Sequence, residues 1–152
     1  MKAVIVGLTL LLCATAATAD DLVPLEQLLG GQPEESYQQV RCAGFYLANI
    51  EWGGQALSET MFEESKAVIS ALLLVATLQR ASNVEGDMES LALTVNADAR
   101  AIADLYAVNY RQSYAARGAA WAGNPLWESD AGTCQPIGEV ALLLKADLEK
   151  GQ

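Results

Sequence analysis

The sequence predicts an all-α fold, a disulfide-linked, up-down-up-down four-helix bundle with a short N-terminal helix. Apolar residues recur at the spacing of one helix face, and no segment shows the sustained alternation of a strand. Glycine, asparagine and proline punctuate the chain where helices are expected to end. Two cysteines, Cys42 and Cys134, are left to pair once the N-terminal segment is removed.

The first 19 residues have the pattern of a cleaved signal peptide. Lys2 precedes an apolar segment over 3–14, and Ala17-Thr18-Ala19 has the small side chains of a cleavage site. The apolar run is about a dozen residues long, whereas crossing a bilayer takes roughly 20. We therefore expect a periplasmic or secreted protein without a stable membrane anchor after cleavage, in which residues 20–152 form a single helical-bundle domain.

Two cysteines in an exported chain most simply form one disulfide, Cys42–Cys134. This bond would tie the middle of the second helix to the start of the last one. The chain that follows the long fourth helix should therefore fold back beside it. Two buried free thiols are the alternative.

The first two helices follow from their end signals. Residues 20–29 are expected to form the short helix, and Pro33 suits the start of the second helix, which ends at Gly53-Gly54. The inward face of this second helix carries four apolar residues, Val40, Ala43, Leu47 and Ile50. Gly44 weakens the helix interior, so it predicts the close approach of another helix or of segment 124–133.

The third helix is expected to start at Ser58 or Thr60 and to end at Ser82-Asn83. Either hydroxyl can cap the first turn, and Thr60 with Glu63 fits a capping box. Apolar residues lie nearly all round this helix, which predicts that it is the most buried element.

The fourth helix is expected over residues 84–117, with acidic residues at its start and arginines toward its end, as the helix dipole favours. Gly118 or Gly123 should end it. Residues 124–133 are expected to be irregular, because Asn124-Pro125 is a turn signal. Pro136 should open the last helix.

Composition argues against several classes of function. The formal net charge is −10 and histidine is absent. Nucleic-acid binding needs clustered lysine and arginine, and anionic lipid repels an acidic surface. Zinc, copper and haem sites are disfavoured without histidine and with both cysteines paired. We predict no metal and no cofactor.

Two acidic stretches are weak candidates for a calcium loop. Oxygen-bearing side chains alternate from Asn83 to Glu89 around Gly86, but the glycine comes too early and Thr94 stands at the twelfth position instead of glutamate. An acidic helix N-terminus explains this stretch better. A still weaker loop candidate consists of Glu128, Asp130 and Gly132.

A row of tyrosines and arginines marks a candidate interaction surface. It consists of Tyr106, Tyr110, Arg111, Tyr114 and Arg117. Tyrosine and arginine are enriched at binding hot spots, because they combine a large contact area with polar groups. The alternative is a half-buried seam of the bundle whose hydroxyls face water.

Aromatic residues near the expected disulfide form a candidate pocket. They are Phe45, Tyr46, Trp121 and Trp127. The alternative is simple packing around the disulfide.

No nucleophile elbow, phosphate loop or dinucleotide fingerprint is present, and no catalytic residue is predicted. The leading hypothesis is a non-enzymatic, exported helical-bundle protein that binds a protein partner or self-associates. The alternative hypothesis is a carrier of a small apolar ligand within the bundle. A third hypothesis is a carboxylate-dependent hydrolase, with the pairs Glu59/Glu63 and Asp98/Asp104 as its formal candidates.

Overall fold

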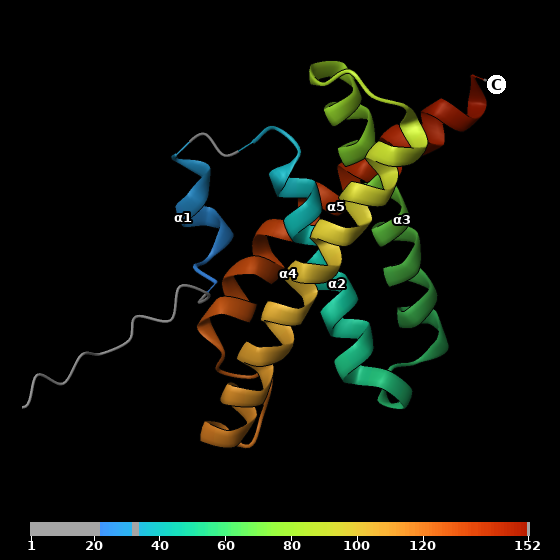
Figure 1. The fold of residues 1–152 in the computed structure, drawn as a ribbon. Coiled ribbons are helices and arrows are strands. Elements are labelled where there is room, and N and C mark those ends of the chain that lie inside the picture. Colours follow the sequence, from blue (N-terminus) through green and yellow to red (C-terminus); the bar gives the residue numbers. More distant parts are fainter. Residues whose placement is uncertain (1–21, 32–33, 152) are drawn as a thin grey trace, which may run out of the picture.

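The computed structural model describes residues 22–31 and 34–151, and the predicted signal peptide lies outside this part of the chain. Its helices are α1 (Leu25–Leu29), α2 (Tyr37–Gly53), α3 (Glu59–Asn83), α4 (Met88–Arg117) and α5 (Pro125–Lys150), and a 3-10 turn (Gly54–Ala56) follows α2. Within the described residues there is no strand, and no helix is long and apolar enough to cross a membrane. The four long helices pack together and alternate in direction (Figure 1). The expected all-α class is confirmed.

Helix α2 lies at the centre of the packing. It packs against α3, α4 and α5, most extensively against α4. At Gly44, an added Cβ would lie 2.6 Å from the side chain of Ile102 and 2.8 Å from the carbonyl oxygen of Ala99. The glycine therefore permits the close approach of α4. Of the two expected neighbours of Gly44, it is another helix and not segment 124–133 that lies against it.

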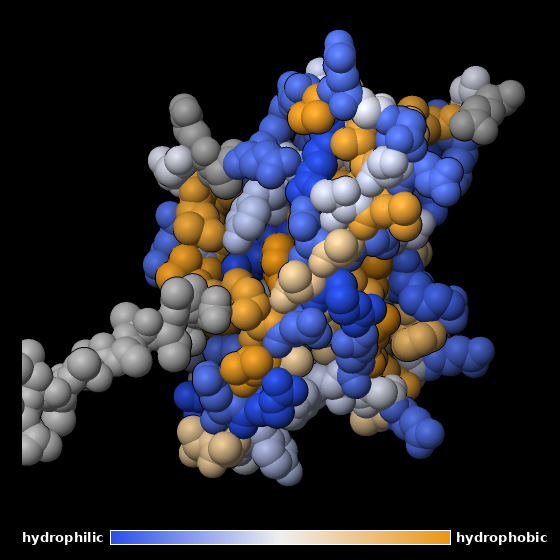
Figure 2. Space-filling view, viewed as in Figure 1, coloured by the Kyte–Doolittle hydropathy of each residue, from blue (hydrophilic) through white to orange (hydrophobic). Residues whose placement is uncertain are grey.

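The most buried helix is α2 rather than α3, so that expectation was wrong. Burial in α3 is confined to positions between Ile69 and Thr77, while Met61 and Phe62 in its first turns are exposed. An apolar helix is buried all round only if neighbours cover every side, and the outer side of α3 is left open along part of its length. Figure 2 likewise shows apolar patches among the hydrophilic side chains on one face of the molecule.

The disulfide joins α2 to α5. Cys42 and Cys134 are bonded, with their Cα atoms 5.2 Å apart, and both are completely buried in the hydrophobic core. The expected pairing is confirmed, and α5 does return along the bundle after α4.

Side-chain caps set the starts of α3 and α4. Ser58 accepts a hydrogen bond from the Met61 amide, so Ser58, and not Thr60, caps α3. Asp87 accepts one from the Ser90 amide, and α4 therefore begins at Met88, later than residue 84. Hydrogen bonding to Ser90 lowers the pKa of Asp87.

Helix α5 corrects the expectation for the C-terminal region. Residues 125–133 are helical and not irregular, because Asn124 caps the helix and Pro125 occupies a first-turn position that needs no amide donor. Pro136 lies inside the helix and does not open it. The carbonyl of Gly132, which loses its amide partner at Pro136, belongs to an exposed residue that water can solvate.

Candidate functional site

The four residues of the candidate pocket line one open cavity of about 460 Å³. Phe45 and Tyr46 come from α2, Trp121 from the loop between α4 and α5, and Trp127 from the first turns of α5. Six further residues complete the lining: Asn49, Leu57, Met61, Ser65, Ala131 and Gln135. We call this cavity the aromatic pocket.

The aromatic rings of the pocket pack on one another. The rings of Trp121 and Trp127 are stacked with their centroids 6.2 Å apart, and Phe45 meets Tyr46 edge-to-face at 5.5 Å. Phe45 also contacts Trp127 in a tilted arrangement at 6.2 Å. Rings at these separations restrain one another, so the wall is preformed without a ligand.

A polar contact fixes the edge of Trp127. Its indole Nε1 donates a hydrogen bond of 3.0 Å to Asn49 Oδ1, and the Tyr110 hydroxyl donates one of 2.9 Å to the same oxygen. Asn49 thus links α4, α2 and α5 at the side of the pocket. It also places an amide group among largely apolar lining atoms.

Trp121 is positioned by a loop with its own hydrogen bonds. Gly118 and Gly123 adopt positive φ angles of 74° and 69° at its two ends, a conformation that suits glycine. The Ser113 hydroxyl donates to the Ala119 carbonyl at 2.7 Å. The Asn124 side chain donates to the Ala120 carbonyl at 2.8 Å. The loop therefore holds Trp121 against α5.

A second, smaller cavity of about 250 Å³ adjoins the aromatic pocket and shares Tyr46, Met61, Ser65 and Gln135 with it. It adds two carboxylates, Glu64 from α3 and Glu139 from α5. Burial, with a further contribution from the charge of Glu139, raises the pKa of Tyr46. The Tyr46 hydroxyl therefore stays protonated at neutral pH between the two cavities.

The candidate interaction surface is not brought together as one exposed surface. Tyr106 and Tyr110 are completely buried, because this side of α4 packs on α2. Burial raises the pKa of both phenols. Tyr114, 58% exposed, and the two arginines Arg111 and Arg117 remain on the outside. The surface must be corrected to these three residues.

The alternative for this row, a seam whose hydroxyls face water, does not hold for the two buried tyrosines. Tyr106 donates a hydrogen bond to Asp130, and Tyr110 donates one to Asn49. Both tyrosines are therefore parts of internal networks that link helices.

A buried ionic cluster, which no sequence pattern indicated, joins α2, α4, α5 and the segment before α1. The Arg41 Nη2 atom donates to Asp130 Oδ2 at 2.7 Å and to the Val23 carbonyl at 2.8 Å. The Arg41 Nε atom donates to the Tyr106 hydroxyl at 2.6 Å, and the Leu25 amide donates to Asp130 Oδ1 at 2.7 Å. Burial alone would lower the pKa of Arg41, but the electrostatic and hydrogen-bonding contributions of the Tyr106 hydroxyl and the Asp130 carboxylate outweigh it and raise that pKa. The cluster fastens the segment before α1 to the bundle.

The calcium-loop candidate around Asp130 was wrong, because this carboxylate points into the core and binds Arg41. Across the described residues, no group of three or more histidine, cysteine or carboxylate side chains is placed to hold a metal ion. The carboxylates of the hydrolase hypothesis lie on helix surfaces. Glu59 and Glu63 are exposed on α3, and Asp98 forms an ion pair with Arg80 at 2.7 Å.

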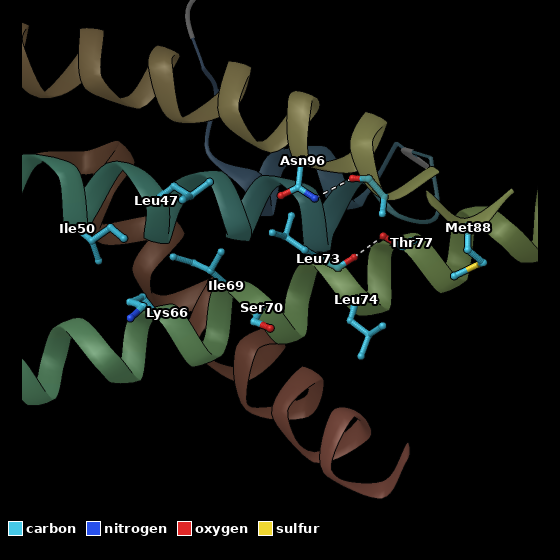
Figure 3. A pocket seen from close by; sticks show the side chains of 11 residues that line it. Leu47, Ile50, Lys66, Ile69, Ser70, Leu73, Leu74, Thr77, Met88 and Asn96 are labelled. Carbon is cyan, nitrogen blue, oxygen red and sulfur yellow. Dashed lines mark hydrogen bonds between the residues drawn. The ribbon is translucent and has the colours of Figure 1, made fainter. Parts of the chain in front are cut away.

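Another groove, of about 520 Å³, lies between α2, α3 and α4 (Figure 3). Its walls are mostly aliphatic, with Leu47 from α2, Ile69 from α3 and Met88 from α4. The Thr77 hydroxyl and the Asn96 amide there are bonded to carbonyls of their own helices. The other two polar side chains of the groove, Lys66 and Ser70, are bonded to Glu63 and Lys145. The groove therefore leaves few free polar groups to a ligand.

Comparisons with models of protein families, with curated proteins and with solved structures find nothing that matches this chain.

Proposed function

We propose that the protein binds a small apolar ligand in the aromatic pocket and carries it. The observation that carries this proposal is the convergence of Phe45, Tyr46, Trp121 and Trp127 on one cavity. Its volume of about 460 Å³ falls within the roughly 300–1,000 Å³ typical of small-molecule sites. Its lining combines apolar walls with a few polar groups, which is the usual composition of such sites.

The place of action that we propose is the periplasm or the extracellular space. The Cys42–Cys134 bond supports it, because structural disulfides persist in oxidising compartments. A small apolar compound is poorly soluble in those aqueous spaces, and a protein cavity that shields it from water would let it diffuse.

Native mass spectrometry of the protein, purified without denaturant from its own host, tests the proposal. We expect a mass above that of the chain, which disappears when the same sample is denatured. Trp121→Ala should lose the excess mass, whereas Leu93→Ala, at an exposed position of α4, should retain it. A bare chain mass in the native spectrum of the wild type would contradict the proposal.

A second candidate function is self-association, favoured by the C-terminal half of α5. Leu143 is 67% exposed there. Beside it lies an apolar groove between α3 and α5 of about 530 Å³, lined in part by Leu78 and Leu148. An exposed apolar side chain beside an apolar groove suits a twofold contact with a second copy, in which Leu143 of each copy enters the groove of the other.

Sedimentation analysis over a range of protein concentrations tests this candidate. We expect a dimer that Leu143→Gln weakens. Leu93→Gln is the matched control, because Leu93 is 66% exposed on α4, away from the groove. A wild-type monomer at all concentrations would exclude the second candidate and leave the first one intact.

A further inference from the structure

The aromatic pocket has the wall chemistry of a cation site. The faces of tryptophan, tyrosine and phenylalanine rings carry partial negative charge, and they attract an organic cation held within about 6 Å of the ring centre. Here two stacked indoles, Trp121 and Trp127, stand beside Phe45 and Tyr46 around one cavity. A cation in the cavity would lie among aromatic side chains from α2, from α5 and from the loop between α4 and α5.

The charges around the pocket point the same way. Neither the aromatic pocket nor the adjoining cavity is lined by lysine or arginine, whereas Glu64 and Glu139 line the adjoining cavity. Among the described residues, neither of these glutamates forms an ion pair. Glu139 accepts a hydrogen bond from the neutral amide of Gln135 at 3.1 Å. An anionic ligand would find no partner of opposite charge there.

Resting on the proposed function, we propose that the largely apolar ligand of the aromatic pocket also carries one positive charge, as a quaternary or protonated amine with a large apolar body does. The apolar body lies against Phe45, Trp121 and Trp127. The charged group lies toward Tyr46, on the side where Glu64 and Glu139 line the adjoining cavity. The net charge of −10 favours the approach of a cation over long range.

Tryptophan fluorescence can test this inference with a matched set of probes. Trp52 does not line the pocket, so Trp52→Phe leaves Trp121 and Trp127 as the reporters. The probes are benzyltrimethylammonium, its uncharged carbon isostere neopentylbenzene, and the anion benzylsulfonate. We expect the cation to bind about tenfold or more tightly than the isostere, as desolvated cation–π contacts allow, and the anion to bind most weakly.

Charge variants distinguish the contribution of the carboxylates to cation binding from that of the aromatic rings. Glu64→Gln and Glu139→Gln should each weaken binding of benzyltrimethylammonium about two- to fivefold, the range of exposed ion pairs, and leave neopentylbenzene unchanged. Glu89→Gln is the matched control, because it removes the same charge from an exposed position of α4 outside both cavities and, like the other two, it has no ion pair among the described residues. Added salt should weaken the binding of benzyltrimethylammonium and leave the binding of neopentylbenzene unchanged.

The outcomes separate the two proposals. Equal affinity for benzyltrimethylammonium and neopentylbenzene would overturn the cation inference and leave a pocket for apolar ligands. Tighter binding of benzylsulfonate would also overturn it. Failure of all three probes to change the fluorescence of Trp121 and Trp127 would overturn the cation inference and count against the proposed function as well.

Discussion

The carboxylate of Asp130 on α5 lies 2.7 Å from the guanidinium of Arg41 on α2, and both side chains are completely shielded from solvent. Each charge is compensated by the other and by surrounding hydrogen bonds. A buried ion pair is a weak source of net stability, but removal of one partner leaves the other charged and unpaired. The fold therefore depends on both residues being present together.

Asp130→Asn should destabilise the protein strongly, because Arg41 would stay buried without a countercharge. We expect a loss of about 3–5 kcal/mol in the free energy of unfolding, measured by urea denaturation. Asp104→Asn, at an exposed position of α4, should change it by less than about 0.5 kcal/mol. Equal stability of the two variants would mean that the buried pair is not formed.

Gly44→Ala should destabilise the contact between α2 and α4. The new methyl group would overlap Ile102 and the Ala99 backbone, and overpacking of this kind costs about 1–3 kcal/mol. Gly132→Ala is the matched control, since it also lies in a helix but has open space around it. That variant should be stabilised by about 0.5–1 kcal/mol. In thermal unfolding, we expect Gly44→Ala to lower the melting temperature and Gly132→Ala to raise it. A change of the same sign in both variants would contradict the close approach of α2 and α4.

Reduction of the disulfide should lower the free energy of unfolding without removing the helices. Cys42 and Cys134 are 92 positions apart, for which the chain-entropy model gives an upper figure of about 4–5 kcal/mol. The measurement is urea denaturation with and without reductant. The Cys42→Ser/Cys134→Ser double variant should no longer respond to reductant, and an insensitive wild type would show that the bond is absent.

Alkaline pH should unfold the protein through its buried tyrosines. The pKa values of Tyr106 and Tyr110 are raised by burial, while in the unfolded chain both phenols ionise near pH 10. The unfolded state therefore loses protons first as the pH rises. The free energy of unfolding should be unaffected by these groups below about pH 10 and should fall above it, by up to about 1.4 kcal/mol per pH unit for each group.

The readout of that prediction is phenolate absorbance recorded together with circular dichroism. Absorbance from Tyr106 and Tyr110 should appear only as the helical signal is lost. Tyr110→Phe should make the loss of stability with pH less steep. Ionisation of all five tyrosines in a chain that remains helical would contradict the burial of the two phenols.

Local patterns were sufficient to predict much of the fold. The helical spacing in α2 and its end at Gly53-Gly54 depend only on neighbouring residues. The Cys42–Cys134 pairing follows because these two cysteines are left once the predicted signal peptide is removed. The error at Asn124-Pro125 has a physical cause, because the same pair suits a turn and a capped helix start. The burial of Leu126 and Asp130 in the core decides for the helix over the turn, and it depends on tertiary packing that the local sequence does not show.

The aromatic pocket could be predicted as a group of residues, but the two glutamates of the adjoining cavity could not. Phe45 and Tyr46 share a helix with Cys42, and the disulfide brings α5 with Trp127 toward them. Glu139 comes to line the adjoining cavity only through the packing of α5 against α3. The partner of Arg41 was hidden for a similar reason, since any of the 19 acidic residues could have compensated an arginine on a largely apolar helix face.

Binding in the aromatic pocket can be observed directly through the indole N–H resonances of the protein labelled with nitrogen-15. The chain has three tryptophans, and two of them line the pocket. On titration with benzyltrimethylammonium, the resonances of Trp121 and Trp127 should move together and saturate with a single Kd, while that of Trp52 stays in place. Trp121 and Trp127 resonances that stay unmoved with both benzyltrimethylammonium and neopentylbenzene, or shifts confined to the groove around Leu47 and Met88, would contradict a ligand site in the aromatic pocket.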